Sequence, residues 1–84
     1  MNILIVEDEP EAASRLAKIL KELRPDVRIL ASLDSVISSV KWLKENPSPG
    51  LIFVDIQLAD GLSFEILEKV EVKAPVIFTT AYNE

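Results

Sequence analysis

Acidic residues follow two of the most apolar stretches of this sequence. Glu7 and Asp8 come directly after the run ILIV, and Asp55 comes directly after the run LIFV. Short apolar runs of this kind that end in polar turn residues are typical of strands buried on both faces of a parallel sheet. A carboxylate at the end of such a strand is either solvated or used in chemistry. Three of them could hold a cation or supply a nucleophile if the fold brought them together.

Size and composition exclude several kinds of site. The 84 residues contain no cysteine and no histidine and carry a formal net charge of -5. Disulfides, thiol or imidazole chemistry, and metal sites built from Cys or His are therefore excluded. Nucleic acid binding needs clustered Lys and Arg, and the acidic balance argues against it. No stretch reaches the length of a membrane span and the start lacks a signal peptide, so we expect a cytoplasmic protein.

Three helices are expected between the apolar runs. Apolar spacing predicts a helix over residues 10–24, a second helix capped by Asp34 or Ser35, and a third that opens at Gly61. We expect the apolar stripe of each helix to face the core. The stripes are Ala13, Leu16, Ala17, Leu20 and Leu23 in the first helix, Val36, Ile37, Val40 and Leu43 in the second, and Phe64, Leu67 and Val70 in the third.

The predicted fold is α/β, a doubly wound parallel sheet. Strands are expected over residues 1–6, 27–32 and 51–55 and from Pro75 onward. Alternating strands and helices form parallel sheets through right-handed crossovers, so the first helix should cover one face and the other two the opposite face. We expect the strand order 2-1-3-4. Ligands of such sheets bind beyond the carboxyl ends of the strands where the winding reverses, here between the first and third strands.

Glu7, Asp8 and Asp55 should therefore meet at one edge of the sheet. Neighbouring strands lie roughly 4.8 Å apart, so carboxylates that follow the first and third strands face one crevice. Their mutual repulsion disfavours ionisation of all three unless a cation lies among them. Oxygen ligands, few in number, suit Mg²⁺. We add the main-chain carbonyl of Gln57 as a ligand because it lies two residues beyond Asp55, on the loop that faces this crevice.

Three segments resemble the receiver domain of bacterial two-component response regulators. ILIVEDE, VDIQLADG and PVIFTTA stand where that family has its acidic pair, its phosphoacceptor strand and its threonine-containing fourth strand. The resemblance implies a flavodoxin-like fold and a single partial receiver domain over residues 1–84. The ending FTTAYNE is most similar to receivers that precede LytTR-type DNA-binding domains. Any DNA binding would belong to such a domain and not to these residues.

The resemblance also implies roles for the acidic residues. Asp55 would accept a phosphoryl group from a phosphohistidine on a sensor histidine kinase. Mg²⁺ would be held by Asp8, Asp55 and the Gln57 carbonyl, with Glu7 acting mainly through a bound water. Any enzymatic activity would be limited to Mg²⁺-dependent self-phosphorylation and self-dephosphorylation at Asp55.

Two residues of the fourth strand complete the implied phosphoryl pocket. Thr80 would donate its hydroxyl to a phosphoryl oxygen, and the small Ala81 would leave the pocket open. The family also has a lysine at the end of a fifth strand, followed by a last helix, and no residue here takes the role of that lysine. We therefore expect a receiver truncated after its fourth strand.

Truncation suggests an alternative function. Without a last helix, the fourth strand would be an open edge and one face of the sheet would be partly uncovered. Exposed apolar area and unpaired edges favour association, so we expect a homodimer through that edge or that face. In the alternative reading, the chain is a receiver fragment without efficient phosphotransfer that acts as a folding or dimerisation module.

Two enzyme classes fit the sequence less well. A dinucleotide-binding enzyme needs a glycine-rich first turn such as GxGxxG, whereas this chain has VEDEPEAA at that position. A phosphatase with an aspartyl nucleophile remains formally possible. However, the position two after Asp55 is Gln57, and no acid follows on that loop until Asp60.

Overall fold

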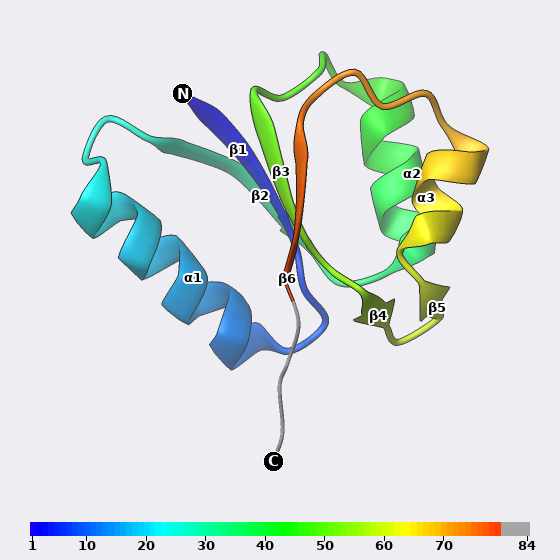
Figure 1. Ribbon diagram of the computed structural model, residues 1–84, viewed down its shortest axis with the longest axis horizontal. Coiled ribbons are helices and arrows are strands. Elements are labelled where there is room, and N and C mark those ends of the chain that lie inside the picture. Colours follow the sequence, from blue (N-terminus) through cyan, green and yellow to red (C-terminus); the bar gives the residue numbers. More distant parts are fainter. Residues whose placement is uncertain (80–84) are drawn as a thin grey trace.

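The chain forms a four-stranded parallel sheet with helices on both faces (Figure 1). The computed structural model describes residues 1–79. The sheet contains β1 (Asn2–Val6), β2 (Arg28–Leu33), β3 (Leu51–Asp55) and β6 (Val76–Thr79), in the order β2-β1-β3-β6. The helices are α1 (Pro10–Leu23), α2 (Val36–Glu45) and α3 (Phe64–Lys69), and a small antiparallel hairpin is formed by β4 (Gln57–Leu58) and β5 (Gly61–Leu62). The predicted α/β class and strand order 2-1-3-4 are confirmed.

The central strand β1 divides the core into two layers. Successive side chains of a strand point to opposite faces, and Ile3 and Ile5 pack in one buried cluster with Ala13 of α1. Leu4 and Val6 pack in the other cluster, together with residues of α2 and α3. In Figure 1, α1 accordingly lies on one side of the sheet and α2 and α3 lie on the other. The predicted placement of the helices is confirmed.

Proline residues mark both ends of α1. Pro10 occupies the first helical position, where its missing N–H and fixed φ are compatible with a helix start. The helix ends at Leu23, and Arg24 has left helical geometry. Steric conflict with the ring of Pro25 disfavours a helical conformation at Arg24. The sequence places this helix correctly to within a residue.

All three predicted apolar stripes are wrong in part. Leu23, the last residue of the first stripe, is 70% exposed at the end of α1. Ile37 is 72% exposed, and Ser39 is fully buried on α2. The hydroxyl of Ser39 can be buried because it donates a hydrogen bond to the Ser35 carbonyl at 2.7 Å. On α3, Phe64 and Leu67 are each nearly half exposed, and the buried residue is one that the stripe left out, Ile66.

The third helix starts three residues later than predicted because the hairpin takes up the intervening chain. Gly61 lies in β5, paired with Leu58 of β4, and its φ of 150° is one that side chains with a Cβ rarely adopt. The turn of this hairpin is made by Ala59 and Asp60. Strands of two residues are too short to show an apolar periodicity, so this hairpin is not predictable from the pattern of the sequence.

The N-terminus of α2 is capped from two directions. Ser35 Oγ accepts a hydrogen bond from the Ser38 N–H at 3.0 Å, which confirms Ser35 as the N-cap. Asp60, from the hairpin turn, accepts hydrogen bonds from the N–H groups of Val36 and Ile37 at 2.7 and 3.0 Å. The first turn of α2 contains no acidic residue of its own. A remote carboxylate therefore supplies the negative charge that a helix N-terminus favours.

Asp60→Asn is expected to lower the free energy of unfolding at neutral pH, because the amide has no charge and one acceptor oxygen instead of two. The hydrogen bonds from Val36 and Ile37 hold the pKa of Asp60 below its ordinary value of 3.8. The ionised form therefore stabilises the fold above that pH, and its contribution is lost as the pH falls through the lowered pKa. Urea unfolding of parent and variant should show a difference that narrows below pH 3.8. A difference that is independent of pH would contradict this account.

Candidate functional site

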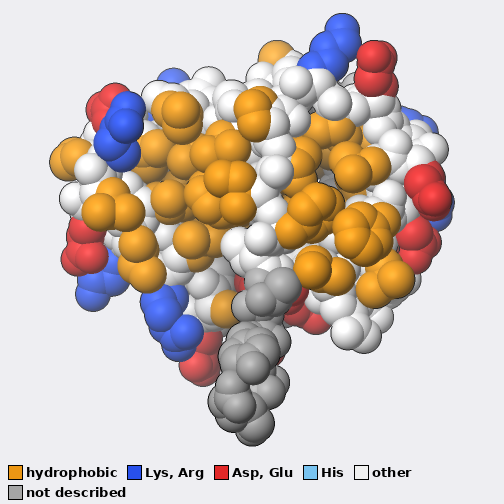
Figure 2. Space-filling view, viewed as in Figure 1, with side chains coloured by type: hydrophobic (Ala, Val, Ile, Leu, Met, Phe, Trp, Pro, Cys, Tyr) orange, Lys and Arg blue, Asp and Glu red, His pale blue; other side chains and the backbone are white. Residues whose placement is uncertain are grey.

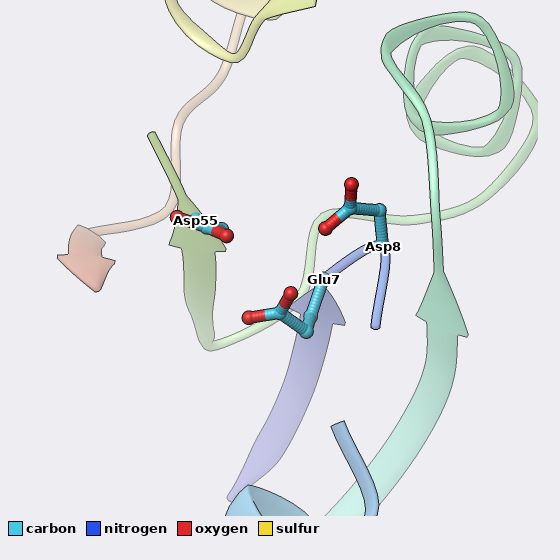
Figure 3. Close-up of side chains that lie close together, drawn as sticks. All are labelled: Glu7, Asp8 and Asp55. Atoms are coloured by element: carbon cyan, nitrogen blue, oxygen red, sulfur yellow. The ribbon is translucent and has the colours of Figure 1, made fainter. Parts of the chain in front are cut away.

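The strand register brings the three predicted carboxylates together. β1 and β3 are parallel neighbours whose last paired residues are Val6 and Val54, so Glu7 and Asp55 follow at the same edge. The carboxylates of Glu7, Asp8 and Asp55 each offer an oxygen within 4.8 Å of the others. Figure 3 shows the three side chains grouped beyond the ends of β1 and β3. The structure thus assembles the acidic cluster that the sequence predicts.

Burial and charge act together at this cluster. Asp55 is 8% exposed, and Glu7 and Asp8 are partly buried. Burial raises the pKa of the Glu7 carboxyl above its ordinary value of 4.5. A hydrogen bond from the Glu9 N–H, at 3.1 Å, opposes this rise, and the charge of Asp55 adds to it. Ionising Glu7 is therefore less favourable in the folded chain than in the unfolded chain.

The donor set fits a hard divalent cation. Three carboxylates within a few ångströms supply oxygen ligands and negative charge, which Mg²⁺ prefers, and solvent can complete its coordination shell. Glu7, Asp8 and Asp55 are the residues that would hold it. Gln57 begins β4, two residues after Asp55, and the role of its carbonyl stays a prediction. The predicted roles of Thr80 and Ala81 lie outside the described residues.

Backbone hydrogen bonds fix the segment that follows Asp55. Asp55 is paired with Thr79 of β6, and the Ile56 N–H donates to the Thr79 carbonyl at 3.2 Å. The Ile56 carbonyl accepts from both the N–H and the hydroxyl of Ser63, at 2.8 and 3.1 Å. Ser63 is almost completely buried. Sequence reasoning missed Ser63, although a serine just before an apolar helical run is a recognisable helix-start signal.

A cavity adjoins the acidic cluster on the side of β2. It has a volume of about 260 Å³, and its lining includes Glu7 and Asp8, Asp34 from the segment that leads into α2, and Ser38 from the first turn of α2. Asp55 does not line it. The cluster is therefore open to a partner or to solvent from this side, while Asp55 is covered.

Comparison with known proteins decides the family. The sequence pattern of the response regulator receiver domain matches residues 3–84. The chain belongs to the response regulator receiver domain family. Relatives include the sensory transduction protein LytT of Enterococcus faecalis, 37% identical over all of this chain and 35% of its own length. The phyllosphere-induced regulator PhyR of Methylorubrum extorquens is 44% identical over 98% of this chain and 31% of its own length.

Solved receiver structures share the fold. The response regulator MaeR, in a structure bound to beryllium trifluoride, is 31% identical with a TM-score of 0.78, covering all of this chain and 70% of that one. The receiver domain of PhyR from Erythrobacter litoralis is 36% identical with a TM-score of 0.73, covering 96% and 63%. This receiver spans about a third of the length of the LytT and PhyR relatives. LytT and PhyR are both among the relatives, so a LytTR-type domain following this receiver stays a prediction.

Within residues 1–79, every helix is too short or too polar to cross a membrane.

Mg²⁺ is expected to stabilise this receiver by relieving repulsion within the cluster. At ten times its dissociation constant, a ligand that binds only the folded state contributes about 1.4 kcal/mol. For a chain of this size the melting temperature should rise by roughly 6 to 11 °C. Without metal, Asp55→Asn should melt above the parent, because it removes one of three crowded charges, and it should respond less to Mg²⁺.

Differential scanning calorimetry of parent, Asp55→Asn and Glu68→Gln would check this. Glu68 is an exposed acid on α3 and serves as the matched control, so its variant should respond to Mg²⁺ as the parent does. An equal rise in melting temperature for all three chains would show only nonspecific binding and would contradict the prediction.

Proposed function

We propose that this receiver is the phosphoacceptor of a two-component pathway and takes a phosphoryl group on Asp55 from a phosphohistidine of a sensor histidine kinase. The observation that carries the proposal is the placement of Asp55. Asp55 is buried at the end of β3. The carboxylates of Glu7 and Asp8 lie close to it, and together the three could hold a cation. Membership of the receiver family supports the same assignment.

The proposed reaction is a phosphoryl transfer between two side chains. A carboxylate oxygen of Asp55 forms a bond to phosphorus while the P–N bond of the phosphohistidine breaks. The electron pair of that bond remains on the imidazole nitrogen, and the product is an acyl phosphate. Such transfers depend mainly on positioning and on positive charge near the phosphoryl oxygens.

In this proposal Mg²⁺ would be held by Asp8, Asp55 and the Gln57 carbonyl, with Glu7 acting through a bound water. The bound ion would supply the positive charge that this acidic crevice lacks. Thr80 would donate a hydrogen bond to a phosphoryl oxygen, and Ala81 would leave space for it. The protein chain itself holds the nucleophile in place, because β3 fixes Asp55 and the Ile56 hydrogen bonds fix the segment after it.

The similarity to MaeR, which was solved bound to beryllium trifluoride, supports the proposal that this receiver also binds a small anionic group. Hydrolysis of the acyl phosphate, as self-dephosphorylation, would return Asp55 to its carboxylate. We also propose a cytoplasmic location and no contact of these residues with nucleic acid. An aspartyl phosphatase is not proposed, because the one further acid on the hairpin, Asp60, accepts hydrogen bonds from the start of α2.

Incubation with acetyl phosphate and Mg²⁺ is expected to add one phosphoryl group to the parent and none to Asp55→Asn. Intact mass spectrometry measures the adduct, and removal of Mg²⁺ by a chelator should reduce its amount by at least about tenfold, as expected when charge stabilisation is lost. Circular dichroism would establish that both chains are folded. A folded parent without adduct, or an equal adduct on Asp55→Asn, would overturn the assignment of Asp55.

A second candidate function is association through β6, and the exposed apolar side chains around this strand favour it. β6 is the end strand of the sheet described for residues 1–79, and Ile77 and Phe78 are 44% and 37% exposed. Phe78 contacts Phe64, another exposed aromatic residue, with ring centroids 5.2 Å apart. Figure 2 shows apolar side chains gathered on both sides of the region that β6 occupies in Figure 1. An apolar edge of this kind favours pairing with a second copy.

We propose a two-fold homodimer through this edge as the form that such association takes. Ile77→Lys is expected to shift the chain from dimer to monomer at micromolar concentration, because it places a charge at the edge of β6. Ile37→Lys is the matched control, since Ile37 is also exposed but lies on α2. Sedimentation velocity measures both. A parent that sediments as a monomer, or equal dissociation of the two variants, would overturn the dimer.

A further inference from the structure

The hairpin that follows Asp55 is too small to be stable alone. Each of its strands has two residues, and short two-stranded hairpins are at best marginal in water. It is held in place by contacts with its surroundings. Leu58 is 4% exposed and belongs to the core cluster beneath α2 and α3. Ser63 binds the Ile56 carbonyl at the base of the hairpin, and Asp60 binds α2 at its tip.

The contact at the tip joins parts of the chain that are distant in sequence. Both carboxylate oxygens of Asp60 are used, one by the Val36 N–H and one by the Ile37 N–H, 24 and 23 residues away. Hydrogen bonds from N–H groups to a carboxylate are stronger than those between neutral groups. Two donors in a rigid helix fix both the position and the orientation of the acceptor. Asp60 is thus tied to the end of α2 at two points.

Asp60 and the predicted ligand Gln57 belong to the same hairpin. Gln57 is paired with Leu62, and Leu58 with Gly61, so the turn that contains Asp60 closes directly on the strand that begins at Gln57. Gln57 and Asp60 are three positions apart in the chain, which limits the distance between their Cα atoms to about 11 Å. A displacement of the tip should therefore be transmitted to Gln57, because only Leu58 and Ala59 lie between Gln57 and Asp60 and the two strands of the hairpin are paired.

We infer that Asp60 is a positioning residue: by its two hydrogen bonds to the start of α2, it holds the hairpin so that the Gln57 carbonyl faces the Glu7, Asp8 and Asp55 cluster. This inference rests on the proposed function, since it gives Asp60 a supporting role at the same cation site. Asp60 is not one of the residues that would hold the cation. It acts through the backbone of the hairpin, as groups outside the ligand shell do when they orient a ligand.

The test is the Mg²⁺ dissociation constant of the folded chain, measured by calorimetric titration for the parent, Asp60→Ala, Asp60→Asn and Ser35→Ala. Loss of a group that orients a metal ligand typically weakens binding by about 10- to 100-fold. We expect a weakening of about tenfold or more for Asp60→Ala. A smaller loss is expected for Asp60→Asn, because its amide keeps one acceptor oxygen. Circular dichroism under the same conditions shows which variants are folded.

Ser35→Ala is the control for a purely structural role of the cap. It removes the hydrogen bond to the Ser38 N–H at the same helix end but leaves the hairpin untouched. It should destabilise α2 while leaving the Mg²⁺ dissociation constant as in the parent. Repeating the titrations at about 0.5 M salt separates positioning from the long-range effect of the lost charge, because screening then acts within a few ångströms.

A second readout needs no metal. Amide hydrogen exchange at Leu58 and Gly61 should be faster in Asp60→Ala than in the parent, and unchanged in Ser35→Ala. Equal Mg²⁺ affinity of Asp60→Ala and the parent, a weakening that disappears at high salt, or unchanged exchange in the hairpin would each overturn the inference. If the parent itself binds no Mg²⁺, the proposed cation site is wrong and the role of Asp60 at it falls too.

Discussion

The parallel pairing of β1 with β3 is the constraint on which the rest of the structure depends. Parallel strands end at the same edge, so the residues after Val6 and Val54 must share one crevice. The residues that meet there are Glu7, Asp8 and Asp55, all of them acidic, and Asp55 is buried. Folding therefore concentrates negative charge, which opposes it. Apolar burial supplies the compensation, since fully burying a side chain of the size of Leu4 or Ile5 contributes about 1.5 to 3 kcal/mol.

Side chains outside the acidic cluster also hold this edge of the sheet together. Asp60 caps a helix whose own first turn has no acid, and Ser63 binds the carbonyl that follows Asp55. Each contact satisfies groups that would otherwise be unpaired in a partly buried place. Asp60 is thus the side chain that links the start of α2 to the hairpin, while Ser63 fixes the segment directly after Asp55.

The sequence predicts the parts of the fold that depend on local pattern and general topology. Four apolar runs, three helical segments and right-handed crossovers fix the strand order, and the order alone brings Asp55 to Glu7 and Asp8. The errors have both local and remote causes. Within α2 itself the apolar pattern predicts Ile37 in the core, whereas Ser39 is buried there with its hydroxyl bonded to the Ser35 carbonyl.

Contacts between remote segments were equally invisible in the sequence. The sequence predicts a helix start at Gly61, and nothing near Asp60 indicates that its side chain binds the start of α2, more than twenty residues earlier. Within residues 1–79, β6 is the end strand of the sheet, and its Thr79 is paired with Asp55 and accepts the hydrogen bond of Ile56. Pairing of a second chain on β6 would therefore act on the strand next to Asp55, the proposed phosphoacceptor. By linkage, phosphorylation and association through this edge would then influence one another equally.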